Sequence, residues 1–135
     1  MALVDFTQLE AWQKAMDLAV KIHGVTKDFP NDERYGLTSQ LRRAAVSVAS
    51  NIAEGFGRYT YPDKKSKYIQ SRGELVEVMS SLHYGERVKY ITTSVLEDLM
   101  QDCIVVQKLL NGLISSMDKL KNSITSSLSS QVLSP

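Results

Sequence analysis

Residues 37–54 read LTSQLRRAAVSVASNIAE, and the spacing of apolar side chains in this stretch decides the fold. Apolar residues recur three and four positions apart, which is the period of one face of an α-helix. They form two adjoining rows, one of Leu37, Leu41, Ala44, Ala45, Val48 and Ile52, the other of Ala45, Ala49 and Ala53. Together the rows cover about half of the helix circumference. A helix with so wide an apolar arc is expected to be covered on more than one side.

The same period recurs in three further segments, so the sequence predicts four helices. Their expected ranges are about 9–28, 37–54, 61–88 and 95–120. The connections between them are short, and no segment shows the alternation bounded by turns that is typical of a β-strand. We therefore predict an all-α protein, an antiparallel up-down-up-down four-helix bundle over residues 1–121. The serine-rich segment 122–135 is expected to be a disordered tail.

Turn and capping residues set the expected helix ends. Gly55 and Gly57 are expected to end the second helix, since glycine is common just past a helix C-terminus. Thr60 is expected to cap the third helix. Ser94 begins a capping box, Ser-Val-Leu-Glu, for the fourth. Gly73 lies inside the third helix at a cost of roughly 1 kcal/mol relative to alanine, and a close helix crossing there would be one reason for the glycine.

Composition indicates an ordinary soluble domain. Of the 135 residues, 43% are hydrophobic and 23% are charged, which is typical of globular proteins. The chain has one cysteine, Cys103, so it can form no internal disulfide. It contains neither the pattern of a signal peptide nor an apolar run long enough to cross a membrane. We therefore expect a cytoplasmic protein with no membrane association.

The net charge of +1 conceals an uneven distribution. Residues 34–72 contain eight basic and two acidic side chains, whereas the segments on both sides are net acidic. Within this basic region, one group straddles the connection between the second and third helices. The group consists of Arg58, Lys64, Lys65, Lys67 and Arg72, with Tyr59, Tyr61 and Tyr68 interleaved. Cations attract phosphates and aromatic rings stack on unpaired bases, so these five cations are candidate nucleic-acid-binding residues. The alternative is an ordinary solvated face.

Two features of the second helix suggest polar contacts within the chain or between subunits. Its polar arc contains Gln40, Arg43, Ser47, Ser50, Asn51 and Glu54. This arc is either a solvated face or the lining of a channel in a ring, and Asn51 and Glu54 could satisfy backbone groups of the following turn. Arg42 points instead toward the alanine row. It is either a structural or snorkelling side chain, or a subunit contact that meets Glu74 or Glu77.

Several runs in the chain resemble the bacterial four helix bundle protein family, also known as the intervening-sequence protein of large-subunit ribosomal RNA. They are Phe29-Pro30, ERYGLTSQLRRAAVSV at 33–48, NIAEG at 51–55, Gly57-Arg58, WQKA at 12–15, RGEL at 72–75 and Glu77. Lys89-Tyr90-Ile91 resembles a Gly-Tyr-Ile of the family, with lysine in place of the glycine, and Glu74 replaces an expected serine. The resemblance covers about residues 5–118.

The resemblance implies a four-helix bundle that assembles as a ring-like homopentamer. The chain is also similar to the accessory variability determinant of diversity-generating retroelements, which is a basic pentamer that binds nucleic acid and partners a reverse transcriptase. Neither resemblance implies an enzymatic activity.

The sequence contains no residue pattern that is typical of a catalytic or metal site. The two histidines, His23 and His83, belong to no Glu-x-x-His pair, and Cys103 lies on an apolar helix stripe. We therefore expect no catalytic residue, metal or cofactor. Two classes of function remain open. The first is a homo-oligomeric accessory platform that binds RNA or DNA, and the second is a protein-interaction scaffold that binds no nucleic acid.

Overall fold

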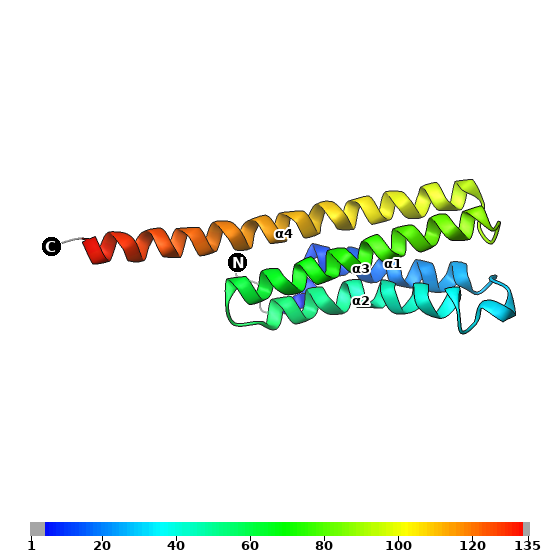
Figure 1. Ribbon diagram of the computed structural model, residues 1–135, viewed down its shortest axis with the longest axis horizontal. Helices are drawn as coiled ribbons and strands as arrows, with labels where there is room; N and C mark the ends of the chain where they lie inside the picture. The colour runs from blue at the N-terminus through cyan, green and yellow to red at the C-terminus, as the bar shows by residue number, and fades with distance from the viewer. Residues whose placement is uncertain (1–4, 134–135) are drawn as a thin grey trace.

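The computed structural model describes residues 5–133 of the chain, and the side chains of residues 5–128. The described part contains four α-helices and two short 3₁₀ helices. These are η1 (Phe6–Gln8), α1 (Glu10–Thr26), η2 (Asn31–Glu33), α2 (Leu37–Gly57), α3 (Tyr61–Arg87) and α4 (Thr93–Leu133). Successive helices run antiparallel, and α4 projects far beyond the other three (Figure 1). The predicted all-α four-helix bundle is confirmed.

The wide apolar arc of α2 is covered inside a single chain. α2 packs against α1 and against α3, while α4 packs against α3 and α1 and closes the bundle. Ala45 and Ala49 of the second alanine row are buried, and Ala53 is partly buried. Coverage on more than one side is therefore confirmed, and the bundle itself supplies it. The arc alone does not require a second subunit.

Two close contacts join α2 to α3. The Ser71 hydroxyl donates a hydrogen bond of 2.6 Å to the Val48 carbonyl, and both side chains are fully buried. Gly55 packs against the buried ring of Tyr68. The close crossing suggested at Gly73 is wrong, because a Cβ placed there would meet nothing within 4 Å. The glycine that allows helices to approach is Gly55, which the sequence suggested only as a helix end.

The helix ends agree with the predictions in part. Thr60 caps α3, and its hydroxyl accepts a hydrogen bond of 3.2 Å from the Asp63 amide. The expected capping box at Ser94 is wrong, because α4 begins at Thr93, two residues before the expected start at residue 95. The Thr92 hydroxyl accepts a hydrogen bond of 3.1 Å from the Val95 amide. Thr92 therefore supplies the side-chain oxygen at the start of α4.

Residues 122–133 are helical in the structure, where we expected a disordered tail. Neither proline nor glycine occurs between Gly112 and Pro135. A helix that is already formed extends by one hydrogen bond for each residue added, and nothing in this segment stops α4 before Leu133. Residues 134 and 135 lie outside the described residues. In the part of the chain that the structure describes, none of the helices is long and apolar enough to cross a membrane.

Candidate nucleic-acid interface

Four of the five cations proposed from the sequence lie where α2 ends and α3 begins, and Arg72 lies further along, near the middle of α3. Lys64 does not face solvent freely. Its ammonium donates a hydrogen bond of 2.6 Å to the Phe56 carbonyl and lies 5.5 Å from the centre of the Phe56 ring. Burial lowers the pKa of Lys64. This lysine therefore stabilises the last turn of α2, where backbone carbonyls lack helical partners.

Three more of the cations have partners within the chain. Lys65 forms an ion pair of 2.7 Å with Asp118 of α4, and Lys67 forms one of 2.8 Å with Glu54. The Lys67 ammonium holds the pKa of the Glu54 carboxyl below its usual value, with a smaller contribution from Arg58. The Arg72 guanidinium donates a hydrogen bond of 3.0 Å to the Asn111 side chain. These contacts reduce the positive field that the five cations present to solvent.

Arg58 and its neighbour Tyr59 remain open. Both lie in the connection between α2 and α3, and neither makes a side-chain hydrogen bond or ion pair with another described residue. The Tyr59 side chain is 97% exposed, whereas Tyr68 is buried in the core and Tyr61 is partly buried. Of the three interleaved tyrosines, Tyr59 alone is almost fully exposed, and its neighbour Arg58 makes no side-chain hydrogen bond or ion pair with another described residue.

The fold adds one cation that sequence reasoning did not include. Lys121 of α4 and Lys65 of α3 line the same cavity of about 370 Å³, together with Tyr61, Met117 and Asp118. Lys121 belongs to the segment after the basic region, and no short-range motif links it to Lys65. Only the antiparallel packing of α3 and α4 brings the two lysines to one end of the bundle.

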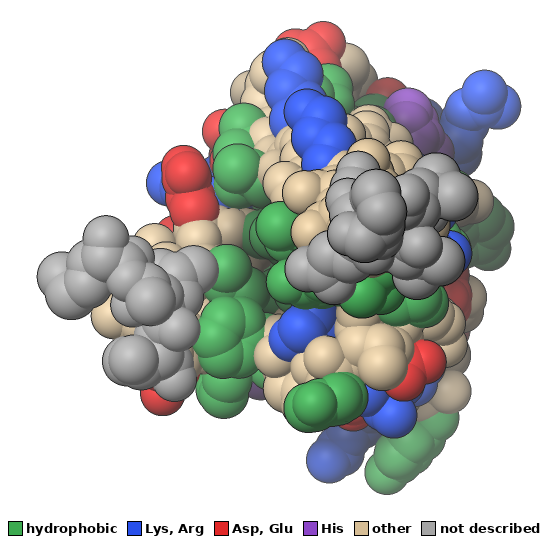
Figure 2. Space-filling model, turned by 90° about the vertical axis from the view of Figure 1, so that its left-hand side faces the viewer, with side chains coloured by type: hydrophobic (Ala, Val, Ile, Leu, Met, Phe, Trp, Pro, Cys, Tyr) green, Lys and Arg blue, Asp and Glu red, His purple; other side chains and the backbone are tan. Residues whose placement is uncertain are grey.

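Figure 2 shows this end of the molecule with the projecting part of α4 toward the viewer. Lysine and arginine side chains are scattered over the face among acidic, apolar and polar ones, and they form no single basic patch. The candidate interface is therefore a set of separate cations around the connection between α2 and α3.

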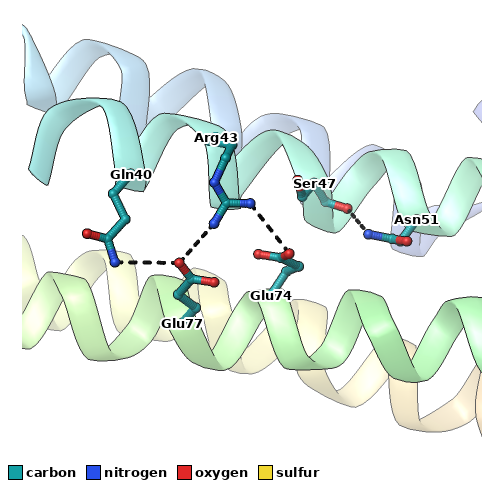
Figure 3. Close-up of polar contacts among 6 residues, drawn as sticks. All are labelled: Gln40, Arg43, Ser47, Asn51, Glu74 and Glu77. Atoms are coloured by element: carbon teal, nitrogen blue, oxygen red, sulfur yellow. Dashed lines mark hydrogen bonds and ion pairs between the residues drawn. The ribbon is translucent and has the colours of Figure 1, made fainter. Parts of the chain in front are cut away.

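The polar arc of α2 faces α3, and Figure 3 shows its contacts. The Arg43 guanidinium forms ion pairs of 2.9 Å with Glu77 and 3.5 Å with Glu74, and Gln40 donates a hydrogen bond of 3.5 Å to Glu77. The nearby Glu74 and Glu77 carboxylates raise the pKa of Arg43. Glu74 Oε2 is buried and receives no hydrogen bond from the described residues. Arg43 is therefore the compensating charge for this carboxylate.

Arg42 is the cation that the sequence suggested for Glu74 or Glu77 across a subunit contact. Within the chain, both carboxylates pair with Arg43. Arg42 donates hydrogen bonds of 2.8 Å to the Thr26 hydroxyl and 3.2 Å to the His23 carbonyl, so it ties α2 to the end of α1. This is the structural role that was the alternative to a subunit contact. A subunit contact by Arg42 would have to compete with these bonds.

Asn51 and Glu54 also differ from expectation. The Asn51 amide donates a hydrogen bond of 2.9 Å to the Ser47 carbonyl, one helical turn back, and Glu54 pairs with Lys67. Neither side chain satisfies the backbone between Gly55 and Gly57. The Lys64 ammonium serves that end of α2 instead.

The Cys103 thiol and the possible metal ligands form no reactive cluster among the described residues. Burial raises the pKa of the Cys103 thiol to about 12, so this thiol is protonated at neutral pH. Within residues 5–128, no three histidine, cysteine, aspartate or glutamate side chains gather in a way that could hold a metal ion.

Comparisons with other proteins identify the family. The sequence profile of the 23S rRNA-intervening sequence proteins matches residues 7–112. Among curated proteins, none matches the chain significantly. The fold is similar to the crystal structure of a protein with unknown function from the S23 ribosomal protein family of Bacteroides thetaiotaomicron VPI-5482. That protein is 26% identical, and the alignment has a TM-score of 0.71 and covers 77% of this chain and 97% of the other. The chain therefore belongs to the 23S rRNA-intervening sequence protein family.

Proposed function

We propose that the chain is a non-enzymatic, homo-oligomeric helical platform in the cytoplasm, and that it binds single-stranded nucleic acid at the α2–α3 end of its bundle. The observation that supports this proposal most directly is that Arg58 is followed in the chain by Tyr59, whose side chain is 97% exposed. A free cation next to an exposed ring can contact a phosphate while the ring stacks on an unpaired base. Lys65 and Lys121 supply two further cations at the same end.

The ion pairs of the interface are weak enough to be exchanged for phosphate contacts. The Lys65 and Asp118 side chains are about a third and a half exposed. Exposed pairs of this kind contribute on the order of 0–1 kcal/mol to stability. A phosphate can therefore replace Asp118 as the partner of Lys65 at little cost. Lys64 and Lys67 contribute less in this proposal, because Lys64 is held by the end of α2 and Lys67 is mostly buried.

Oligomerisation would multiply this modest interface. The family resemblance implies a pentamer, in which five copies of the interface act on one strand and raise the overall affinity without any new contact. Light scattering of the full chain tests this part of the proposal. We expect a mass of five chains or a whole multiple of five, and the mass of a single chain would refute the platform.

Fluorescence anisotropy with a labelled single-stranded RNA, recorded over a series of salt concentrations, tests the binding proposal. We expect binding that weakens with salt, and we expect the double variant Arg58→Ala, Lys121→Ala to bind more weakly and with a shallower salt dependence. Arg87→Ala is the matched control, because Arg87 ends α3 at the opposite end of the bundle. Absence of binding to RNA, single-stranded DNA and duplex DNA at low salt would refute the proposal.

The second candidate is a protein-interaction scaffold that binds no nucleic acid. It is favoured by a specific observation, since four of the five cations proposed from the sequence already have partners within the chain. Retention on heparin distinguishes the two candidates. The platform predicts salt-dependent retention, whereas the scaffold predicts none.

A further inference from the structure

The last part of α4 has no partner in the bundle. Among the described residues, the ion pair between Lys65 and Asp118 is the last polar contact along α4 that the structure shows with α3. Beyond it, every side chain from Lys119 to Leu128 is exposed, and the helix projects past the ends of the other three (Figure 1). At 1.5 Å per residue, residues 119–133 extend for roughly 20 Å.

One side of this projecting helix is apolar. Leu120, Ile124 and Leu128 follow one another at intervals of four residues and therefore lie on one face. Between 42% and 56% of each of these side chains is exposed. Met117 and Ile69, which line the cavity between α3 and α4, extend the stripe into the bundle. We refer to Leu120, Ile124 and Leu128 as the tail stripe.

A helix of this composition needs a partner. Residues 122–133 are rich in serine and contain no charged residue, so no side-chain ion pairs support the helix. Serine is a weaker helix former than alanine, leucine or lysine. In proteins, most helical stability comes from packing of the apolar face. Covering the tail stripe is therefore the main available source of stability for this segment.

The segment has no charged side chain, which favours a neutral partner. No charged residue occurs between 122 and 135, and so the segment offers nothing to a strongly charged partner. An identical neutral segment meets it without repulsion and carries an apolar stripe of the same length and spacing. We propose that the tail stripe pairs with the tail stripe of a second copy of this chain, with the two helices antiparallel and crossing at Ile124.

The antiparallel direction follows from the position of Lys121. This lysine lies within one helical turn of the stripe and flanks it. In a parallel pair the two Lys121 side chains would lie side by side and repel each other. In an antiparallel pair centred on Ile124, each Lys121 lies opposite Ser127, and Leu120 lies opposite Leu128. The contact is then self-complementary about a twofold axis.

Disulfide trapping tests the direction and the register together. Under a mild oxidant, we expect Ile124→Cys to form a covalent dimer, because the two cysteines meet at the twofold axis. We expect Leu120→Cys and Leu128→Cys to form a covalent dimer when they are mixed, and neither to do so alone. The native Cys103 does not interfere, because it is fully buried and its thiol pKa is raised.

Ser126→Cys is the matched control, since residue 126 lies on the opposite face of the helix, about 200° from Ile124. Failure of Ile124→Cys to dimerise, or equal dimerisation of Ser126→Cys, would refute the pairing. Dimerisation of Leu120→Cys alone would refute the antiparallel register. A disulfide joins two chains whatever number of copies the bundles assemble into, so the result is independent of the proposed pentamer.

A charge placed on the stripe provides a second test. In the Leu120→Cys and Leu128→Cys mixture, adding Ile124→Glu to both chains should abolish the covalent dimer, whereas adding Ser126→Glu should not. Ile124 is outside the bundle core, so both variants should keep the melting temperature of the bundle. If Ile124→Glu left the yield of dimer unchanged, the tail stripe would not be the contact.

Discussion

Gly55 of α2 lies so close to Tyr68 of α3 that no side chain fits between them. A Cβ on Gly55 would stand 2.6 Å from Tyr68 Cε1 and 2.8 Å from Tyr68 Cδ1. The Tyr68 ring is 2% exposed and cannot swing away into solvent. We expect Gly55→Ala to lower the free energy of unfolding by about 1–3 kcal/mol, as overpacked cores do. Chemical denaturation followed by circular dichroism measures this change.

Gly73→Ala is the control for this prediction. Gly73 lies in the interior of α3, and a Cβ there would meet nothing within 4 Å. The same substitution should therefore raise the free energy of unfolding, by up to about 1 kcal/mol, because alanine favours the helix more than glycine does. If both variants shifted stability in the same direction, the contact with Tyr68 would not be the cause.

Lys89 has a backbone conformation that favours glycine, with φ at 67°. It follows the C-terminus of α3, where the Lys89 and Tyr90 amides donate hydrogen bonds of 3.0 Å and 2.8 Å to the carbonyls of Glu86 and Gly85. This is the Schellman arrangement, whose left-handed position is commonly glycine. We expect Lys89→Gly to raise the free energy of unfolding by about 0.5–1 kcal/mol, measured by denaturation. Lys89→Ala, which keeps a Cβ, should show no such gain.

The helices themselves could be predicted from the sequence because their apolar periods are long and regular. What the sequence could not show is how pairs of helices meet. The suggested crossing at Gly73 was wrong and the contact at Gly55 was missed, since a glycine in a helix looks the same whether its neighbour is solvent or a ring. The resemblance marked Lys89 as a lysine in place of a glycine, but only the backbone angle shows that this position favours glycine.

At the candidate site, too, the sequence could not show which side chains of neighbouring helices meet. The sequence correctly grouped cations near one end of the bundle, because four of the five lie on the connection between α2 and α3 or within three turns of it. It could not reveal that Asp118 and Asn111 of α4 reach Lys65 and Arg72. Nor could it decide whether Arg42 or Arg43 meets the glutamates of α3, since adjacent residues differ by about 100° around the helix.

Arg43 should be energetically coupled to Glu77 across the α2–α3 contact. A double-mutant cycle with Arg43→Met and Glu77→Gln should give a favourable coupling free energy, because the guanidinium and carboxylate are 2.9 Å apart. The coupling should weaken as salt is added, since the pair is partly exposed. Denaturation of the four proteins at two salt concentrations measures it. Arg42→Met is the control, and a similar coupling of Arg42 to Glu77 would contradict the arrangement in Figure 3.

The Cys103 thiol should make stability depend on pH in the alkaline range. Its pKa is raised from 9.0 to about 12, first by burial and then by the nearby Asp102 charge. Between these values the unfolded chain releases the thiol proton while the folded chain keeps it. The free energy of unfolding should therefore fall above pH 9.0 by about 1.4 kcal/mol per pH unit from this group.

The contribution of the thiol is isolated by comparison with Cys103→Ala, because lysines and tyrosines titrate in the same range. We expect the difference in stability between the two proteins to decrease as the pH rises from 9 to 10.5. The folded protein should also resist a thiol-specific reagent at pH 8 and react once it is unfolded in denaturant. Rapid labelling of the folded chain would contradict the burial of Cys103, because a protonated, enclosed thiol is neither nucleophilic nor accessible.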